Sequence, residues 1–274
     1  MATRKYEGKK FELQTSTKIV DALTIEEALQ ININDKAFTI SMRTPGEDAN
    51  LVRGLLHAEG VINDVHFIPD IVLKKEKEDG IVTIVNVAIP EDKLGEGYSN
   101  SRSLLSVSSC GICGKTELGD LAFIGKTIDD KDKIDINDIN RMFEKMKKKK
   151  HNLRKSEETH PLPAFSLDGK FLCTLEDIGS NNAEDRVVGQ LIHSKKIKQA
   201  KVITVSGRIS YEIVIKCFKA QVPFLTAVSA PSSLAVDYAK ELGITLFAFC
   251  RDERATCYSN AQRTKSVQSN IKAS

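Results

Sequence analysis

The sequence predicts a mixed α/β protein with two unlike parts. In residues 1–135, apolar and polar residues alternate on both sides of turn dipeptides, which is the pattern of β-hairpins. From residue 136 onward, short apolar segments alternate with segments of helical spacing. This second pattern is typical of right-handed βαβ units in a mainly parallel sheet. We therefore expect a β-hairpin-rich α+β part over residues 1–135 and an α/β part over residues 136–274.

Composition places the chain among ordinary globular proteins. Its 274 residues can bury a substantial core, and 41% hydrophobic with 28% charged residues is a usual balance. The formal net charge of +3 is too small to indicate a nucleic-acid-binding protein. The sequence lacks an apolar stretch long enough to span a membrane, and its first residues lack the apolar core of a signal peptide. We expect a cytoplasmic protein that binds neither nucleic acid nor membrane.

Two hairpins and one helix are expected in the first part. Residues 28–42 alternate around a turn at Asn34-Asp35, and residues 70–89 alternate around a turn near Asp79-Gly80. Between these hairpins, residues 48–60 have leucines at helical spacing and end on Gly60, a residue that favours a helix terminus.

The second part is expected to begin with a helix over residues 136–150 and a hairpin over residues 163–177, with its turn at Asp168-Gly169. Three helices and three strands then alternate. We predict helix 183–196, strand 201–205, helix 209–220, strand 223–228, helix 233–242 and strand 244–249.

The loops after these three strands are the predicted ligand site, because open α/β sheets bind ligands beyond the carboxyl ends of their strands. They are residues 205–210, 228–233 and 249–254. The first two run into helix N-termini, which favour anions, and Gly207 permits a close backbone approach. Arg208, Arg251 and Arg254 add guanidinium groups that match phosphate geometry. Neither a Walker loop nor a Rossmann glycine pattern is present, so we predict a phosphate-bearing ligand held in another way.

Two cysteines in the segment Ser108–Gly114 are the main chemical motif. They end a polar stretch, residues 90–114, which shows no helical or strand period and is expected to be a mobile loop. Such a pair could bind a metal, form a redox disulfide, carry sulfur as a persulfide, or be inert. The flanking glycines argue against a thioredoxin-type motif, and an exposed thiol pair suits sulfane sulfur transfer. We expect Cys110, preceded by two serine hydroxyls, to carry the persulfide and Cys113 to assist it.

A zinc site is the alternative interpretation of the same cysteines. His57 and Glu59, followed by Cys110 and Cys113, resemble the signature of zinc deaminases. However, Ser109 stands where that signature has proline, and a helix-ending glycine follows Glu59 directly. A zinc deaminase-like enzyme is therefore the lesser alternative, and no zinc is expected. Among the other cysteines, Cys173 and Cys217 lie in apolar segments and are expected to be buried.

Five segments, which together extend over nearly the whole chain, carry a family resemblance: residues 42–62, 108–114, 175–189, 205–236 and 243–258. Through them the chain resembles the formate dehydrogenase accessory protein family, FdhD, whose members are sulfurtransferases for molybdenum- or tungsten-dependent formate dehydrogenases.

The resemblance implies a sulfurtransferase that takes sulfur from a cysteine desulfurase, as a persulfide on a loop cysteine. The sulfur then passes to the molybdenum cofactor, bis-molybdopterin guanine dinucleotide, which is required for formate dehydrogenase activity. The resemblance also implies a cytidine-deaminase-like α/β core, a homodimer, and guanine nucleotides as partial mimics of the cofactor. The alternative is a non-catalytic chaperone for the same cofactor, in which the thiols are dispensable.

The expected cofactor-binding residues combine the sheet-edge argument with the segment that the resemblance marks near the C-terminus. They are Gly207, Arg208, Ser229, Ser232, Phe249, Cys250, Arg251, Asp252, Glu253 and Arg254. One segment, residues 175–183, departs from the family's usual Arg-Glu-Asp-(Val/Ile)-Gly-Arg-His-Asn-Ala. Leu175, Ser180 and Asn181 stand there in place of two basic residues and a histidine, in a segment expected to face the site.

Overall fold

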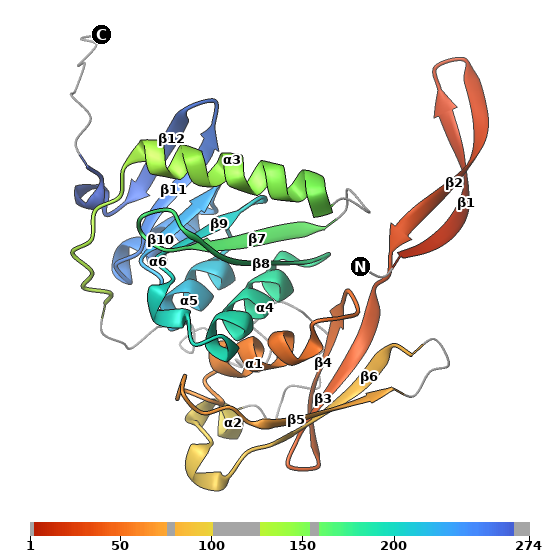
Figure 1. The fold of residues 1–274 in the computed structure, drawn as a ribbon, viewed down its shortest axis with the longest axis horizontal. Helices are drawn as coiled ribbons and strands as arrows, with labels where there is room; N and C mark the ends of the chain where they lie inside the picture. The colour runs from red at the N-terminus through yellow and green to blue at the C-terminus, as the bar shows by residue number, and fades with distance from the viewer. Residues whose placement is uncertain (1–2, 76–79, 101–126, 154–158, 266–274) are drawn as a thin grey trace.

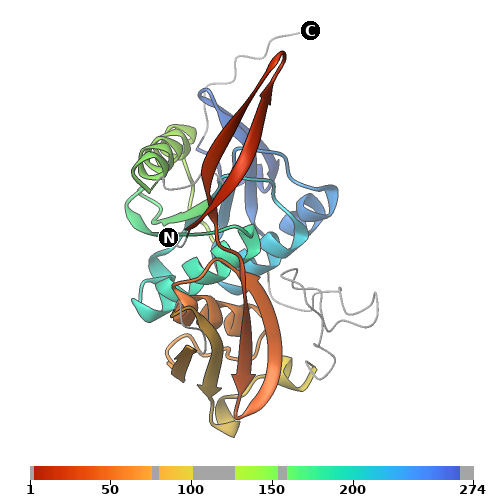
Figure 2. The same ribbon diagram turned by 90° about the vertical axis from the view of Figure 1, so that its right-hand side faces the viewer.

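The computed structural model of the protein describes residues 3–75, 80–100, 127–153 and 159–265. Figure 1 shows a four-stranded sheet in the N-terminal part and a six-stranded sheet in the C-terminal part, with helices between them. A two-stranded hairpin, β1–β2, projects from the body. In the view turned by 90°, the six-stranded sheet lies in the upper half of the molecule and the four-stranded sheet in the lower half (Figure 2). In these ranges, each helix is too short or too polar to span a bilayer.

The N-terminal part contains both predicted hairpins and the predicted helix. Its elements are β1 (Thr3–Glu12), β2 (Thr15–Thr24), β3 (Glu27–Ile33), β4 (Lys36–Arg43), α1 (Asp48–Ala58), β5 (Asp70–Lys75), β6 (Val82–Ala88), η1 (Glu91–Lys93) and α2 (Glu96–Asn100). Asn34 and Asp35 have φ angles of 48° and 61°, the left-handed conformation that a tight hairpin turn requires. The strand order β4-β3-β6-β5 joins the two hairpins through a parallel pairing of β3 with β6.

The hairpin β1–β2 was not predicted. Its strands pair antiparallel over ten residues each, from Thr3 opposite Thr24 to Glu12 opposite Thr15. Nearly all of its side chains are exposed on both faces, including Phe11 at 73%. A strand without a buried face lacks the alternating apolar pattern by which strands are found in sequences.

The C-terminal part confirms the predicted alternation of strands and helices. Its elements are α3 (Ile136–Leu153), β7 (His160–Phe165), β8 (Phe171–Asp177), α4 (Ser180–His193), η4 (Ile197–Gln199), β9 (Val202–Val205), α5 (Tyr211–Lys219), β10 (Phe224–Ala227), α6 (Ser233–Glu241), β11 (Thr245–Arg251), β12 (Arg254–Ser259) and η5 (Ala261–Arg263). Strands β9, β10 and β11 are parallel, as βαβ units require.

The prediction of a mainly parallel sheet needs correction, because the six-stranded sheet is mixed. Its order is β12-β11-β10-β9-β7-β8, and β7, β8 and β12 pair antiparallel with their neighbours. Two hairpins cause this: β7–β8, which was predicted, and β11–β12, which was not. At the second hairpin, Asp252 and Glu253 have φ angles of 51° and 60° and reverse the chain where a loop was expected. The relation to cytidine deaminases stays a prediction.

Helices cover both faces of this sheet. The side chains of α3 pack with Phe165, Val202, Phe224 and Phe247 on one face. The helices α4, α5 and α6 pack against the other face, where Ile203, Leu225 and Leu246 belong to the largest core cluster. Neighbouring residues of each strand therefore enter different cores, in keeping with the two-residue period of a strand.

The two parts of the chain meet where α1 crosses α4, and a pair of glycines permits this close approach. A Cβ atom at Gly54 of α1 would lie 1.8 Å from the Asp185 carbonyl oxygen of α4. A Cβ atom at Gly189 of α4 would lie 1.9 Å from the Asn50 carbonyl oxygen of α1. The division of the chain at residue 135 stays a prediction. Ile128, which precedes that division, packs in the core of the C-terminal part.

We expect Gly54→Ala to lower the free energy of unfolding by about 1–3 kcal/mol, because the added methyl group forces the two helix backbones apart. Urea unfolding of the full chain measures this change. Gly8→Ala is the matched control, since a Cβ atom there would meet only the Ile19 side chain, at 3.4 Å, on the exposed hairpin. Equal unfolding midpoints for Gly54→Ala and the wild type would contradict a tight helix crossing.

The predicted mobile loop, residues 90–114, is only partly a loop. Its first residues form η1 and α2, and they attach to the end of α1 through backbone hydrogen bonds. The Gly95 amide donates to the Val61 carbonyl at 2.8 Å, and the Gly97 amide donates to the Gly60 carbonyl at 3.3 Å. Hydrogen bonds between backbones do not require a particular pattern of side chains. The sequence therefore did not indicate that the first residues of this segment are ordered. The remainder of the predicted loop, with Cys110 and Cys113, lies outside the described residues.

Candidate functional site

A cavity of about 770 Å³ lies at the carboxyl ends of β9 and β10, where ligands bind in open α/β sheets. Its volume is within the usual range of ligand pockets, roughly 300–1,000 Å³. The lining residues are His160, Ser180, Asn181, Ser206, Gly207, Arg208, Ile209, Ser210, Glu212, Ser229, Ala230, Pro231 and Ser232. The structure thus brings together Gly207, Arg208, Ser229 and Ser232, four of the residues predicted for binding. Their role in binding stays a prediction.

Backbone hydrogen bonds between the two predicted loops hold the cavity walls together. The Ile209 amide donates to the Ala230 carbonyl at 3.1 Å, and the Ser232 amide donates to the Ile209 carbonyl at 2.9 Å. The next strand is attached in the same way, because the Phe249 amide donates to the Ser229 carbonyl at 3.3 Å. These bonds join the loops that follow β9 and β10 to each other and to strand β11.

Three helices start at this cavity and direct their N-terminal ends towards it. Helix α4 starts at Ser180, α5 follows Ser210, and α6 follows Ser232. The Ser232 hydroxyl caps α6 by accepting a hydrogen bond from the Ala235 amide at 3.1 Å. Helix N-termini carry partial positive charge, and Arg208 adds a full one, so the cavity favours an anionic group.

One wall atom is suited to a ligand because the fold does not use it. The Ser206 hydroxyl oxygen is buried and has no hydrogen-bond partner among the described residues. Leaving a buried hydroxyl unbonded costs about 1–3 kcal/mol. A ligand oxygen placed beside Ser206 would recover that free energy, which fits a site built for a polar ligand.

Of the three residues that depart from the usual family segment, Ser180 and Asn181 line the cavity, whereas Leu175 does not belong to its lining. Both residues therefore face the candidate cavity, and their role in binding stays a prediction. The charged side chains of the lining are Arg208 and Glu212, with His160 as a further titratable group. The Glu212 Oε2 atom accepts hydrogen bonds from the Ser210 hydroxyl at 3.0 Å and the Asn181 side-chain amide at 3.2 Å.

A buried ionic cluster supports the cavity from below, and the sequence analysis did not find it. The Lys216 ammonium group donates to the Asn181 carbonyl at 3.1 Å and pairs with Asp185 Oδ2 at 2.5 Å. Burial raises the pKa of Asp185, and the charge of Lys216 partly offsets this effect. Burial also raises the pKa of the neighbouring Glu184 well above its ordinary value, and Glu184 Oε1 accepts a hydrogen bond from the Cys217 thiol at 3.2 Å.

The predicted segment 249–254 borders the cavity but does not belong to its lining. Phe249 is joined to the cavity wall by the backbone hydrogen bond described above, and the residue is 38% exposed. Cys250 packs in the core beneath α3, and burial raises the pKa of its thiol to about 12. A buried, protonated thiol is poorly placed to contact a ligand in the cavity.

The charged residues of the same segment lie at the exposed β11–β12 hairpin. They are Arg251, Asp252, Glu253 and Arg254. Arg254 and Asp252 approach each other at 3.7 Å with largely exposed side chains. Their contribution to binding stays a prediction, and Arg208 is the arginine that the structure places in the cavity lining.

Burial disfavours the thiolate form of the cysteines in the described ranges. Burial raises the pKa of Cys173 and of Cys250 to about 12, and it raises that of Cys217 well above its ordinary value. The pKa of the half-buried Cys257 is also raised by burial. The expected burial of Cys217 is confirmed, whereas Cys173 is only half-buried. Of the six cysteines in the chain, this leaves the predicted pair, outside the described residues, as candidates for sulfur transfer.

The histidine of the alternative zinc interpretation has a structural role. His57 is buried, with Nδ1 3.2 Å from the Ile62 carbonyl oxygen and Nε2 3.1 Å from the Lys219 carbonyl oxygen. Both ring nitrogens are thus engaged by the backbone, and burial lowers the pKa of the ring. Within the described ranges, His, Cys, Asp and Glu side chains do not gather in threes as a metal site requires. His57 joins α1 to the end of α5 instead of presenting a free ligand nitrogen.

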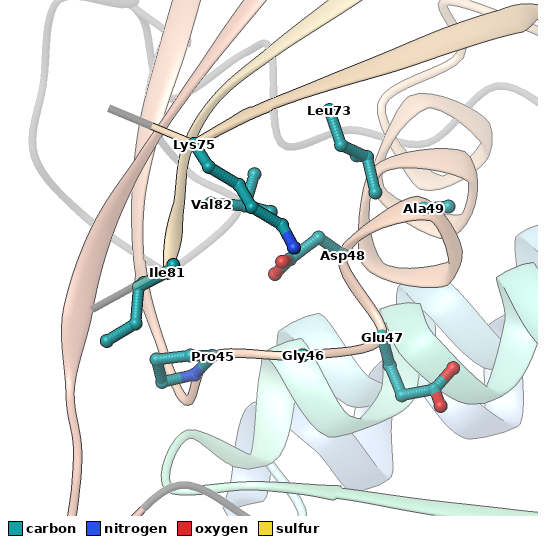
Figure 3. A pocket seen from close by; sticks show the side chains of 10 residues that line it. Pro45, Gly46, Glu47, Asp48, Ala49, Leu73, Lys75, Ile81 and Val82 are labelled. Carbon is teal, nitrogen blue, oxygen red and sulfur yellow. The ribbon is translucent and has the colours of Figure 1, made fainter. Parts of the chain in front are cut away.

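A second hollow, of about 420 Å³, opens between the β4–α1 turn and the β5–β6 strands (Figure 3). The Lys75 side chain extends towards Asp48 across an apolar surface that includes Leu73 and Val82. The buried Asp48 carboxylate already pairs with Arg43 at 2.8 Å. Because the negative charge of this hollow is balanced within the fold, we place the candidate site in the larger cavity.

The fold is that of an α/β protein with a cavity at its sheet edge, and the lining of this cavity favours a polar, anionic ligand. The chain belongs to the FdhD/NarQ family, which it matches over residues 24–265.

Relatives in this family are named sulfur carrier proteins. The chain is 35% identical over 248 residues to the sulfur carrier protein FdhD of Saccharolobus solfataricus, covering 89% of this chain and 91% of the relative. It is 33% identical over 252 residues to the protein of the same name from Mycobacterium tuberculosis, with the same coverage. A crystal structure from Desulfotalea psychrophila, described as a formate dehydrogenase accessory protein, shares the fold with a TM-score of 0.74 at 19% identity. That match covers 96% of this chain and 99% of the other.

Proposed function

We propose that the chain is a sulfurtransferase that receives sulfane sulfur from a cysteine desulfurase, as a persulfide on Cys110. It delivers this sulfur to the molybdenum cofactor, bis-molybdopterin guanine dinucleotide, for use by formate dehydrogenase. The observation that carries this proposal is the cavity at the sheet edge, in a chain whose relatives are named sulfur carriers. We further propose that the protein acts in the cytoplasm as a homodimer.

The cavity has the groups that a dinucleotide substrate needs. Pyrophosphate oxygens require several donors, and the start of α6, the Arg208 guanidinium and the Ser206 hydroxyl supply them from different elements. The serines that line the rest of the wall can donate to ribose and pterin oxygens. A guanine nucleotide should therefore bind as a partial mimic of the substrate.

The proposed sulfur transfer consists of two balanced exchange steps. The Cys110 thiolate attacks the terminal sulfur of the desulfurase persulfide, which forms the Cys110 persulfide and releases the desulfurase thiolate. The Cys113 thiolate can then attack the Cys110 sulfur, forming a disulfide between the two cysteines and releasing the outer sulfur as hydrosulfide. A cellular thiol reductant returns the disulfide to two thiols. The two electrons that convert sulfane sulfur to sulfide thus come from the cysteine pair.

We expect GDP to bind the full chain, and Arg208→Ala to weaken this binding by about tenfold or more, because a charge-assisted hydrogen bond contributes roughly 1.5–3 kcal/mol. Titration calorimetry measures both affinities. Arg251→Ala tests the other predicted phosphate contact, and equal affinity to the wild type would remove Arg251 from the site. Arg141→Ala, on the exposed surface of α3, is the matched control. Unchanged GDP affinity in Arg208→Ala would place the nucleotide elsewhere.

A further inference from the structure

Glu212 is an unexpected group in a cavity that otherwise favours anions. It lies in the first turn of α5, where it lines the cavity beside Arg208 and Ser210. A carboxylate repels the phosphates that the helix N-termini attract. Its position is therefore suited to the part of a ligand that offers hydrogen-bond donors instead of negative charge.

The fold holds this carboxylate in a fixed orientation. Oε2 accepts hydrogen bonds from the Ser210 hydroxyl and the Asn181 side chain. Asn181 is itself held from below, because its carbonyl accepts a hydrogen bond from the buried Lys216. An ionised carboxylate offers about four acceptor positions, so about two remain for a ligand. A preorganised acceptor loses little conformational freedom when a ligand binds.

We propose that Glu212 selects guanine over adenine in this cavity. This inference rests on the proposed function, which places a guanine nucleotide there. Guanine presents two adjacent donors, the N1–H and the 2-amino group, and a carboxylate can accept from both. Adenine presents an acceptor, N1, at the corresponding position, so the negative oxygen would face a lone pair. The carboxylate thus favours one base and disfavours the other.

Calorimetry with GDP, IDP and ADP on the full chain tests this assignment. We expect the wild type to bind GDP at least about tenfold more tightly than ADP, since a hydrogen bond to a charged acceptor is worth that factor or more. IDP lacks the 2-amino group and should have an intermediate affinity. In Glu212→Gln the affinity for GDP should lie within about threefold of the affinity for ADP, because the amide side chain keeps one acceptor oxygen and loses the charge.

Two further variants separate base selection from a structural effect. Glu212→Asp keeps the charge and should retain a preference for GDP at lower affinity, whereas Arg208→Ala should weaken all three nucleotides by a similar factor. Thermal unfolding midpoints verify that each variant is folded. Glu212→Gln that weakens GDP, IDP and ADP equally would overturn the assignment. Wild-type protein that binds GDP and ADP equally would also overturn it but leave the proposed cavity intact. Wild-type protein that binds none of the three would refute the proposed function itself.

Discussion

Replacing Cys110 by alanine is expected to abolish sulfur delivery, so formate dehydrogenase matured with this variant should be inactive. Four of the six cysteines lie in the described residues, and burial raises the pKa of each of their thiols. Cys110 has two preceding serine hydroxyls that can stabilise a thiolate, and Gly111 leaves the adjacent amides open. Cys113→Ala should weaken activation without abolishing it, because a cellular thiol can replace Cys113, more slowly, in attacking the Cys110 persulfide.

Mass spectrometry after incubation with a cysteine desulfurase and cysteine measures the carrier step directly. The wild type should gain the mass of one sulfur atom on Cys110, and Cys173→Ala, a half-buried thiol in β8, is the matched control that should behave alike. A Cys110→Ala protein that takes up sulfur on Cys113 and fully activates the dehydrogenase would contradict the assignment. If the double variant also activates the dehydrogenase, the chain is a cofactor chaperone and not a sulfur carrier.

The elements that the sequence predicted are those with a buried face. Strand β3 and helix α5 bury apolar side chains at regular intervals, and the sequence shows the corresponding periods of apolar residues. Strands β1 and β2 have no such face, so they were missed. Strand β12 was missed for a different reason. Its turn, Asp252-Glu253, adopts the left-handed conformation without the glycine or asparagine that usually indicates a hairpin turn. The charged residues around this turn were therefore assigned to a loop.

The candidate site was predictable where a general rule of topology applies. Gly207, Arg208 and Ser229 follow directly after strands of one parallel set, and the sheet-edge rule places them together. The buried ion pair beneath the cavity joins Asp185 of α4 to Lys216 of α5, and the relative position of these two helices depends on the whole fold. One local signal was available: Glu212 and Lys216 are four residues apart in α5, as are Asn181 and Asp185 in α4. Such pairs lie on one face of a helix, and their polar character on buried helices indicates a network.

The last prediction concerns that network. Lys216→Met should lower the free energy of unfolding at pH 7 by about 3–5 kcal/mol, the usual cost of removing one partner from a buried ion pair. Lys216 and Asp185 are 7% and 2% exposed, so water cannot replace the lost partner. Denaturant unfolding measures the change. Lys240→Met, at the exposed end of α6, is the matched control and should change stability little. The variant should also weaken GDP binding, because Asn181 loses the donor that holds it.

The loss of unfolding free energy in Lys216→Met should depend on pH, and this dependence identifies the cause of the loss. Burial raises the pKa of Asp185 in the folded protein, and Lys216 is the cation that limits this rise. Without Lys216 the folded-state pKa rises further above its unfolded value, so the folded protein binds the Asp185 proton more tightly than the unfolded chain does. Stability is then lost as pH rises through that pKa, and the deficit should shrink as pH falls below it. Adding Asp185→Asn should remove this dependence, since the amide does not titrate. A deficit that is the same at every pH would mean that the loss comes from packing of the lysine side chain and not from its charge.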